Sequence, residues 1–521
     1  MFGLDRKDTI GFILLFCGSF GGTLIACLSQ RVRDLFFFLI VSLTIVTEHV
    51  AMNFVSKEWY RGTSRGFEVS LIDILAISLV ASAFVRPRLR RISAAAVASG
   101  DDRPENRQVR AAGIFEVAPG VYQEKRWFWP ASFGLMILLF LYACVCVAMA
   151  DPKIFGLFAL SKMVRGIIVF LAAAFYVRSE RELKLFVFAL GATVCFEGLY
   201  ALGERYINGT YRVPGTVDDS NSLSMYLCTT APVFMAVLTS RFPIYIKALG
   251  VTAIAVAFVG VILTISRAGL IAILIMLFAA GIMTVSYRLT LRRIIIVLLV
   301  LCGIGGALAK SWKTVGDRFK NDSLKQEYGS KHVQNRGYYI RIALAIANDS
   351  WFGVGPNNWS YLVSNKYGPR LGWHFVPYMD LEQAPSQLVP AGRDIDEPQA
   401  APAHSLAALT IGEMGFGGFA IFSLLWVRWL LMGASFLWPR TPDPMRRMGV
   451  GIFFGICGNF FQSCTEWVFH QSPIFFTFNI MIGVLASLCY LRKQERRARK
   501  VALEYVEEES TWHSQRPAEA Y

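Results

Sequence analysis

The sequence predicts an all-α polytopic membrane protein, with about 12–13 transmembrane helices and a large external loop that itself contains helices. Apolar stretches of about 20 residues recur along almost the whole 521-residue chain. Only 17% of the residues are charged, whereas 55% are hydrophobic. Regular short strands of alternating polarity, which a membrane β-barrel needs, do not occur in the sequence. The composition therefore excludes a soluble enzyme with a tail, a disordered scaffold and a single-span receptor.

Thirteen stretches are long enough, or nearly so, to cross a hydrocarbon core of roughly 30 Å as helices. They lie at approximately 10–28, 35–54, 68–85, 129–149, 155–177, 185–204, 221–240, 246–265, 268–286, 293–309, 405–433, 448–464 and 474–491. The first stretch imitates a lipoprotein signal peptide, because Leu24-Ile25-Ala26-Cys27 resembles a cleavage box. A second apolar stretch follows within a few residues, so we expect an ordinary retained span.

Basic residues are distributed unevenly over the loops. One alternating set of loops, together with the C-terminal tail, holds 30 of the 52 Lys and Arg residues, whereas the opposite short loops hold 9. Because cytoplasmic loops carry an excess of Lys and Arg, the first set is expected in the cytoplasm and the segment 310–403 outside. The same rule accounts for the net charge of +15 without a nucleic-acid partner.

Four regions follow from this reading: 1–309 with spans one to ten, 310–403 as an external cap, 404–491 with the last three spans, and 492–521 as a cytoplasmic tail. Within the first, 86–128 reads as a flexible cytoplasmic loop. The cap holds 11 basic and 9 acidic residues and many aromatic ones, which favours a folded structure over a linker. All ten cysteines lie in apolar stretches, so neither a disulfide framework nor zinc-ligand spacing is present.

Several ionisable residues lie inside the predicted spans, where charge is costly and points to function. With the orientation above, all of them fall in the outer halves of their helices: Glu48, His49, Asp73, Lys162, Arg165, Glu197, Glu413 and Glu466. This one-sided distribution predicts a polar site at the external leaflet, roofed by the cap. The alternative is that these groups pair locally or snorkel to the interface.

Three segments carry specific signals. The first is Thr264-Ile265-Ser266-Arg267-Ala268-Gly269-Leu270, which places an arginine at a break between two apolar helices. The second runs from Asn335 and Arg336 through an amphipathic helix to Gly353-Val354-Gly355-Pro356, and no strand precedes it, so a dinucleotide site is rejected. The third places His404 before a helix that carries Glu413-Met414-Gly415-Phe416-Gly417-Gly418.

In this order the segments resemble the O-antigen ligase and polymerase family of bacterial membrane glycosyltransferases, over roughly 220–420. That family has a Ser-Arg-small-Gly turn, an external arginine helix leading to Asp-x-x-hydrophobic-Gly-x-Gly, and a His before a helix with Glu-x-Gly-x-x-Gly. The chain departs from the pattern in three places. Ser405 follows the His, where the family often has Asn. The aromatic residue that the family has four positions after the helix arginine is Tyr339 here, three positions after Arg336. The small-Asn pair that is common before span seven appears as Ser220-Asn221.

The resemblance implies transfer of a glycan from an isoprenoid (undecaprenyl) diphosphate to an acceptor hydroxyl, at the periplasmic face of the bacterial inner membrane. Guanidinium forks suit the charge that develops on a diphosphate leaving group, so Arg267 and Arg336 are expected to bind it. His404 is expected to be the general base. Glu413 is expected to orient His404 or to line the cavity. Secondary phosphate or sugar contacts are assigned to Arg341, Arg165, Arg61, Arg65 and Asn221.

Direct displacement would invert the anomeric carbon. No cofactor and no metal are expected, because the arginines can neutralise the diphosphate and the Asp394-Ile395-Asp396 pair is typical of a solvated turn. Ligase and polymerase activities differ only in the acceptor: a lipid or protein anchor, or another lipid-linked glycan. A polysaccharide or lipid transporter and a structural scaffold are alternatives, but the chain shows no internal repeat, and a scaffold needs no buried charges.

Overall fold

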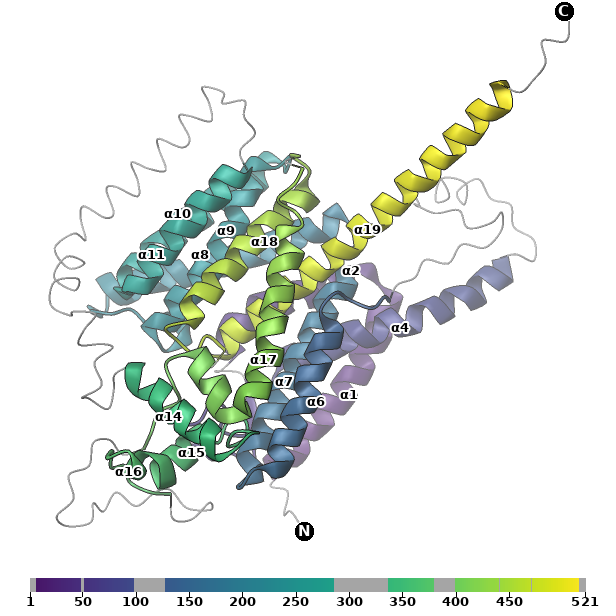
Figure 1. The fold of residues 1–521 in the computed structure, drawn as a ribbon. Coiled ribbons are helices and arrows are strands. Elements are labelled where there is room, and N and C mark those ends of the chain that lie inside the picture. The colour runs from purple at the N-terminus through teal and green to yellow at the C-terminus, as the bar shows by residue number, and fades with distance from the viewer. Residues whose placement is uncertain are drawn as a thin grey trace, which may run out of the picture.

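The computed structural model describes residues 6–47, 51–97, 127–284, 336–378, 399–439, 441–469 and 471–514. These residues form a helical bundle (Figure 1). Within them, eight helices are long and apolar enough to cross a membrane, and α6 (Phe133–Met149) is a shorter apolar helix. The prediction of an all-α polytopic membrane protein is therefore confirmed. The predicted span at 293–309 lies outside the described residues.

The other long helices match the predicted spans in position, but the spans predicted at 68–85 and 474–491 are too short: these helices continue to Val97 and Ser514, into the expected flexible loop and tail. In chain order the long helices are α1 (Arg6–Leu28), α2 (Gln30–Ser42), α4 (Leu71–Val97), α7 (Lys153–Tyr176), α8 (Glu180–Tyr206), α9 (Ser220–Thr239), α10 (Ile244–Thr264), α11 (Arg267–Thr284), α17 (Leu406–Ala434), α18 (Pro444–Ser463) and α19 (Ser472–Ser514). The last of these, α19, runs away from the rest of the molecule at its C-terminal end (Figure 1).

The second predicted span, 35–54, is the main difference. There α2 passes into the short helix η1 (Leu43–Val46), and the chain then forms the strand β1 (Met52–Phe54). This strand pairs antiparallel with β2 (Phe67–Val69), with Asn53 opposite Glu68. Apolar residues therefore continue past the helix into a hairpin, and hydropathy alone does not separate the two.

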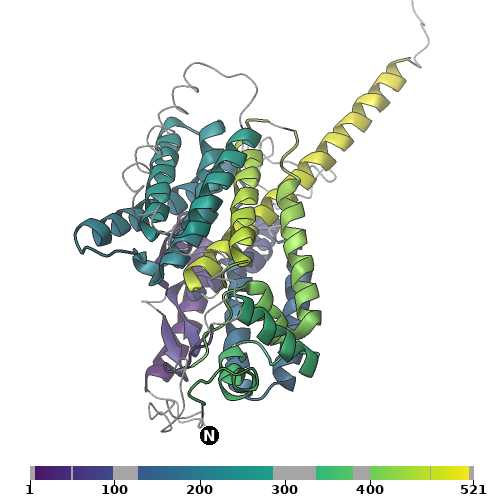
Figure 2. The same ribbon diagram turned by 60° about the vertical axis from the view of Figure 1, so that its left-hand side comes forward.

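The helix α9 is the centre of one group, surrounded by α8, α10, α11 and α18 (Figures 1 and 2). Small residues on α18 permit the closest approach, since a Cβ on Gly455 would lie 2.3 Å from the backbone oxygen of Thr229. Without a hydrophobic force between helices in lipid, such small residues allow the van der Waals packing that holds helices together.

A second group contains α1, α2, α4, α7 and α19. The first helix is integrated into it by glycines: a Cβ on Gly18 would lie 3.1 Å from Ile74, and one on Gly22 would lie 2.4 Å from Ser78. The hydroxyl of Ser78 also donates to the backbone oxygen of Ser19 at 3.3 Å. The first span thus packs as a member of the bundle.

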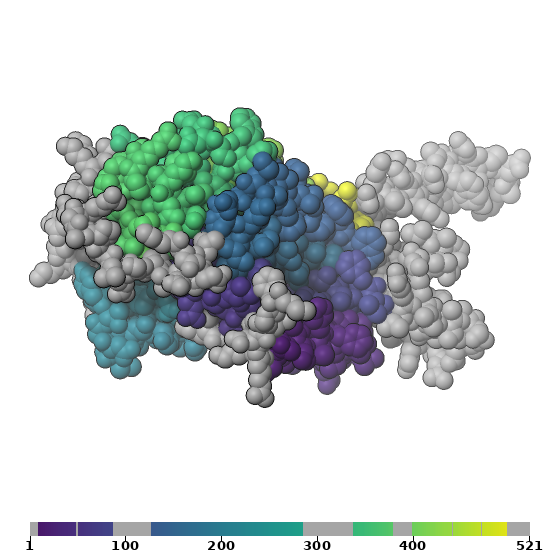
Figure 3. Space-filling view, turned by 90° about the horizontal axis from the view of Figure 1, so that it is seen from below, coloured from purple at the N-terminus to yellow at the C-terminus, as the bar shows by residue number. Residues whose placement is uncertain are grey.

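The cap, defined here as the described residues 336–378 and 399–405, lies at one end of the bundle. It contains α14 (Arg336–Asp349), α15 (Trp359–Leu362), η3 (Val363–Tyr367) and α16 (Gly368–Arg370). The helix α14 packs on α17, and the cap lies beneath α17 and α18 in both ribbon views (Figures 1 and 2). Seen from this end, the cap residues lie beside α6 and α7 (Figure 3). We call this the cap end of the molecule.

Candidate functional site

His404 lies at the cap end, directly before the residue that caps α17. The hydroxyl of Ser405 accepts from the backbone N–H of Ala408, which fixes where the helix begins. The imidazole Nδ1 is 2.9 Å from Oε2 of Glu466, on the turn that follows α18. The Glu466 side chain is only 9% exposed, whereas that of His404 is 38% exposed. The carboxylate is thus held inside while the ring reaches the surface.

A hydrogen-bond chain continues from Glu466 toward the start of α9. Asn221 donates from Nδ2 to Glu466 Oε1 at 3.2 Å, and its own Oδ1 accepts from Nη2 of Arg212 at 3.0 Å. Arg212 also donates from Nε to the backbone oxygen of Thr264 at 3.3 Å. His404 is therefore joined through three side chains to the turn that precedes Arg267.

Arg267 is the first residue of α11, after a turn built for a sharp reversal. Ile265 has a φ of 54°, in the left-handed region that bulky residues seldom adopt. The hydroxyl of Ser266 accepts from the backbone N–H of Gly269 at 3.3 Å, and Gly269 leaves room for α9, since a Cβ there would lie 1.7 Å from the Ser224 hydroxyl. The small residues after Arg267 thus allow the close approach of α9. The positive end of the helix dipole reinforces the arginine's charge at this point.

Two aromatic rings pack against the imidazole of His404. The ring centroid of Tyr339, on α14, lies 5.7 Å from that of His404, and Trp467 lies 5.5 Å away on another side. Arg336 is the first residue of α14, and its side chain lies outside the described part. Arg341 is on the same helix and is exposed. The helix that carries both predicted arginines thus contacts the histidine directly.

The two Gly-containing motifs fit into each other. Gly415, with φ 65° and ψ −173°, breaks α17 and frees backbone oxygens of the preceding turn. Val354 and Gly355 donate their N–H groups to the backbone oxygens of Gly412 and Glu413, at 2.9 and 2.8 Å. A Cβ on Gly415 would lie 1.9 Å from the backbone oxygen of Trp351, so only glycine fits. The Gly353-Val354-Gly355 loop is therefore docked on the broken helix α17, and we call this loop the bracket. Its N–H groups at Val354 and Gly355 bind backbone oxygens and not a phosphate in this arrangement.

Glu413 points into this bracket. Its side chain is buried, and the backbone N–H groups of Asn357 and Trp359 face its carboxyl group. The carboxylate that contacts His404 Nδ1 is that of Glu466. Among the side chains that the structure describes, Glu413, which was expected to orient His404 or to line the cavity, makes no hydrogen bond to the imidazole. Within the described residues, Oε1 of Glu413 has no hydrogen-bond partner.

Asn357 fastens the cap to the loop between the two strands. Its Oδ1 accepts from Oγ1 of Thr63 at 2.9 Å and from the N–H of Ser64 at 3.1 Å. Its Nδ2 donates to the backbone oxygens of Ser64 and Phe155, at 2.8 and 3.0 Å. One amide thus joins three segments that are far apart in the sequence.

The strand loop holds the two outer arginines. Arg61 donates from Nη1 to the backbone oxygen of Gln399 at 2.8 Å, and both Arg61 and Arg65 are exposed. Beside them, Tyr60 and Tyr378 pack with ring centroids 5.8 Å apart. Burial raises the pKa of both phenols, that of Tyr378 to about 12, so this contact stays uncharged at neutral pH. Arg61 and Arg65 accordingly lie at the edge of the cap.

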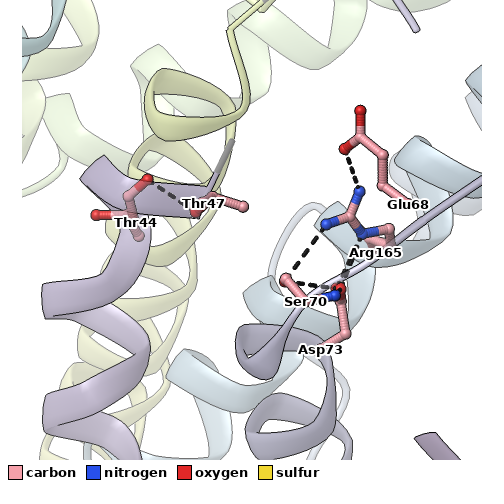
Figure 4. Close-up of polar contacts among 6 residues, drawn as sticks. All are labelled: Thr44, Thr47, Glu68, Ser70, Asp73 and Arg165. Atoms are coloured by element: carbon pink, nitrogen blue, oxygen red, sulfur yellow. Dashed lines mark hydrogen bonds and ion pairs between the residues drawn. The ribbon is translucent and has the colours of Figure 1, made fainter. Parts of the chain in front are cut away.

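Arg165 is held by two carboxylates (Figure 4). Its Nη1 lies 2.7 Å from Glu68 and its Nε 3.0 Å from Asp73, while Ser70 also donates to Asp73. Its guanidinium lies 5.0 Å from the ring centroid of Phe476. The guanidinium is 8% exposed, and the network ties α7 to the β2 end of the hairpin. For Arg165, the structure therefore shows the alternative stated above, in which a charge inside a span is paired locally.

The predicted residues thus separate into groups. His404, Asn221 and the Arg267 turn come together, and Arg336 and Arg341 are on the helix that contacts His404. Glu413, Arg165, Arg61 and Arg65 lie elsewhere. Glu48 and His49 lie outside the described residues, as do Asp394 and Asp396. Among the described side chains, no group of three His, Cys, Asp or Glu residues is placed to hold a metal ion. Metal independence stays a prediction.

Two residues of the hydrogen-bond chain were not assigned a role from the sequence. Glu466 appeared only as one charge near the end of a span, and Arg212 is a single arginine in a short polar loop. The signal for Glu466 was its place in an apolar stretch. Arg212 carries no such signal, and its role appears only when α9 and α10 are brought together.

A comparison with protein families agrees with the motif resemblance. Residues 252–423 match the family model described as O-antigen ligase. The match includes the Arg267 turn, α14 with its Gly-containing loop, and His404 with the broken helix. No curated protein matches the chain.

Proposed function

From its place in the O-antigen ligase and polymerase family, which the match over residues 252–423 supports, we propose that the chain joins a lipid-linked glycan to an acceptor. It is a multi-pass membrane glycosyltransferase of this broad type. The donor is an undecaprenyl diphosphate-linked glycan, and the reaction takes place at the periplasmic face of the inner membrane. The observation that carries the proposal is the hydrogen-bond chain joining His404 to the turn before Arg267.

His404 is the general base. A carboxylate at Nδ1 favours the tautomer with the proton on Nδ1, which leaves the lone pair of Nε2 to accept the proton of the acceptor hydroxyl. Glu466 then stabilises the imidazolium that forms, as the carboxylate of a catalytic triad does. Its low exposure strengthens this interaction, because water screens it little.

The arginines serve the leaving group. The acceptor oxygen attacks the anomeric carbon, the bond from that carbon to the diphosphate oxygen breaks, and the electron pair remains on the diphosphate. Arg267 and Arg336 bind and stabilise this charge, and guanidinium groups suit planar bidentate contacts to phosphate oxygens. A single displacement inverts the anomeric configuration, and the arginines supply the charge neutralisation that a metal would otherwise provide.

A repeat-unit polymerase would use the same residues, with a second lipid-linked glycan as acceptor. Deletion of the gene in its native host, followed by separation of carrier-linked and surface glycans by size, distinguishes the two. Long chains retained on the carrier indicate a ligase, and retained single repeat units indicate a polymerase. Arg267→Ala and His404→Ala complements should reproduce the deletion, and His374→Ala, an exposed cap histidine, should restore the wild-type pattern. Unchanged glycans in the deletion strain would refute the proposal.

A further inference from the structure

Arg212 holds its positive charge without a carboxylate partner among the described residues. It lies on the loop between α8 and α9 and is half-buried. Its two hydrogen bonds go to neutral acceptors, the backbone oxygen of Thr264 and the side-chain oxygen of Asn221. No described residue accepts a hydrogen bond from its Nη1. By contrast, the buried Arg165 is neutralised by two carboxylates.

We propose that Arg212 is a third donor-binding arginine, and that it couples binding of the donor diphosphate to the positioning of His404 through Asn221 and Glu466. This inference rests on the function proposed for the same site. The ligand chemistry is a lipid-linked diphosphate, whose phosphate oxygens would take the hydrogen bonds that the neutral acceptors leave open.

The loop that carries Arg212 is rigid enough for such a role. The carboxylate of Glu197 accepts from the N–H and hydroxyl of Thr216, at 2.9 and 2.7 Å, and Glu204 accepts from the N–H of Gly215 at 2.8 Å. Val213 donates its N–H to the backbone oxygen of Leu263 at 3.3 Å. Because these bonds hold the part of the loop that directly follows Arg212, the guanidinium is organised before a ligand arrives, and little ordering entropy opposes binding.

Its position suits a diphosphate. The backbone oxygen that Arg212 contacts belongs to Thr264, three residues before Arg267 and at the end of α10. The same turn opens α11, whose N-terminal dipole favours negative charge. A diphosphate carries more than one negative charge, and a guanidinium fork can bind two of its oxygens at once. Arg212 and Arg267 therefore serve the same anion from neighbouring segments.

The coupling follows from shared hydrogen bonds. Asn221 accepts from Arg212 with Oδ1 and donates to Glu466 with Nδ2, and Glu466 in turn holds His404. When phosphate oxygens bind the open N–H groups of Arg212, the guanidinium shifts toward them, the Asn221 amide that Nη2 contacts must adjust, and this changes the hydrogen bond to Oε1 of Glu466. Such coupling between two sites is reciprocal and amounts to roughly 5- to 150-fold in known systems. Asn221 and Glu466 are thus positioning residues for His404.

Steady-state kinetics on the full-length protein in lipid nanodiscs test this inference. The donor, an undecaprenyl diphosphate-linked glycan, is varied at saturating acceptor. Arg212→Gln is expected to raise the donor KM by about tenfold or more, and Arg212→Lys to recover part of the loss, because it keeps the charge but not the fork. Asn221→Ala is expected to lower kcat with a smaller change in donor KM. Arg241→Gln, an exposed arginine between α9 and α10, is the matched control with wild-type constants.

A donor KM that stays at the wild-type value in Arg212→Gln, with only a lower melting temperature, would show a purely structural role and overturn the inference while leaving the proposed function intact. If Arg212→Gln does not fold, Arg212→Lys carries the test, with a raised donor KM expected at an unchanged melting temperature. Absence of transfer by both the wild type and Arg241→Gln would refute the proposed function, and this inference with it.

Discussion

Glu466 and His404 are 62 residues apart in the sequence and share a hydrogen bond of 2.9 Å between Oε2 and Nδ1. The carboxylate is on the turn after α18, and the imidazole precedes α17. Since Nδ1 is occupied, Nε2 is the ring nitrogen that remains for the proposed proton transfer. The relationship gives His404 a defined tautomer and orientation, and these are what a general base requires.

Glu466→Gln should lower kcat by about a hundredfold or more, because the amide keeps the shape of the carboxylate but cannot stabilise the imidazolium or fix the tautomer as well. The measurement is the initial rate of glycan transfer at saturating donor and acceptor. His404→Ala should lose at least as much, and the double variant should lose little more than His404→Ala alone. Additive losses would show that the two residues do not act as a unit.

Gly415→Ala should destabilise the junction of α17 with the cap. The residue has φ 65°, and a Cβ would lie 1.9 Å from the backbone oxygen of Trp351, so the Gly353-Val354-Gly355 bracket cannot stay docked. We expect a cost of at least about 2 kcal/mol, read as a lower melting temperature and faster proteolysis of the cap. Gly21→Ala, a helical glycine with nothing within 4 Å of its added Cβ, is the control and should leave both unchanged. Equal melting temperatures for the two variants would contradict the bracket.

Arg165→Met should cost about 3–5 kcal/mol, because it leaves Asp73 and Glu68 without their cation in a largely buried place. Asp73→Asn in the same chain should recover part of the loss. The donor KM of any folded Arg165→Met protein should equal that of the wild type, since the guanidinium is bound inside the protein. A raised donor KM at an unchanged melting temperature would instead place Arg165 in substrate binding.

Asn357→Ala should weaken the attachment of the cap by roughly 2–4 kcal/mol, because the side-chain amide accepts two hydrogen bonds and donates two others, and all four are lost. The φ of 62° at Asn357 adds strain for alanine. Asn357→Gly separates the two effects, since it relieves the backbone but not the lost hydrogen bonds. A melting temperature for Asn357→Gly equal to that of the wild type would show that the side chain holds nothing together.

The fold was predictable to the extent that hydropathy encodes it. Apolar stretches located the helices of the bundle, but α4 and α19 continue beyond their predicted ends at 85 and 491, because the polar residues of their last turns carry no hydropathy signal. The hairpin at 52–54 and 67–69 was not predictable, because three-residue strands of apolar residues look like the end of a span. The break at Gly415 was also hidden, since the freed carbonyls are satisfied by a loop about 60 residues earlier.

The site was predictable where its residues belong to a recognisable sequence motif. His404 and Arg267 stand out because they belong to an ordered set of three motifs, whereas either residue alone at the end of an apolar helix would be an ordinary interfacial or structural one. Their partners do not stand out, because pairing depends on which helices become neighbours. Glu413 is on the helix that follows His404, but the structure brings Glu466 to the imidazole instead, from the turn after α18. Arg212 resembles any other arginine at an interface until the contact with Thr264 is seen.

The most direct test of the central claim is glycan transfer by the purified protein in nanodiscs, from an undecaprenyl diphosphate-linked donor to an acceptor hydroxyl, with the anomeric configuration of the product determined by NMR. The account predicts an inverted product from the wild type and from His374→Ala. It also predicts a rate about 10²- to 10⁴-fold lower from His404→Ala, with the folded protein still present. Transfer by His404→Ala at the wild-type rate, or a product with retained configuration, would contradict it.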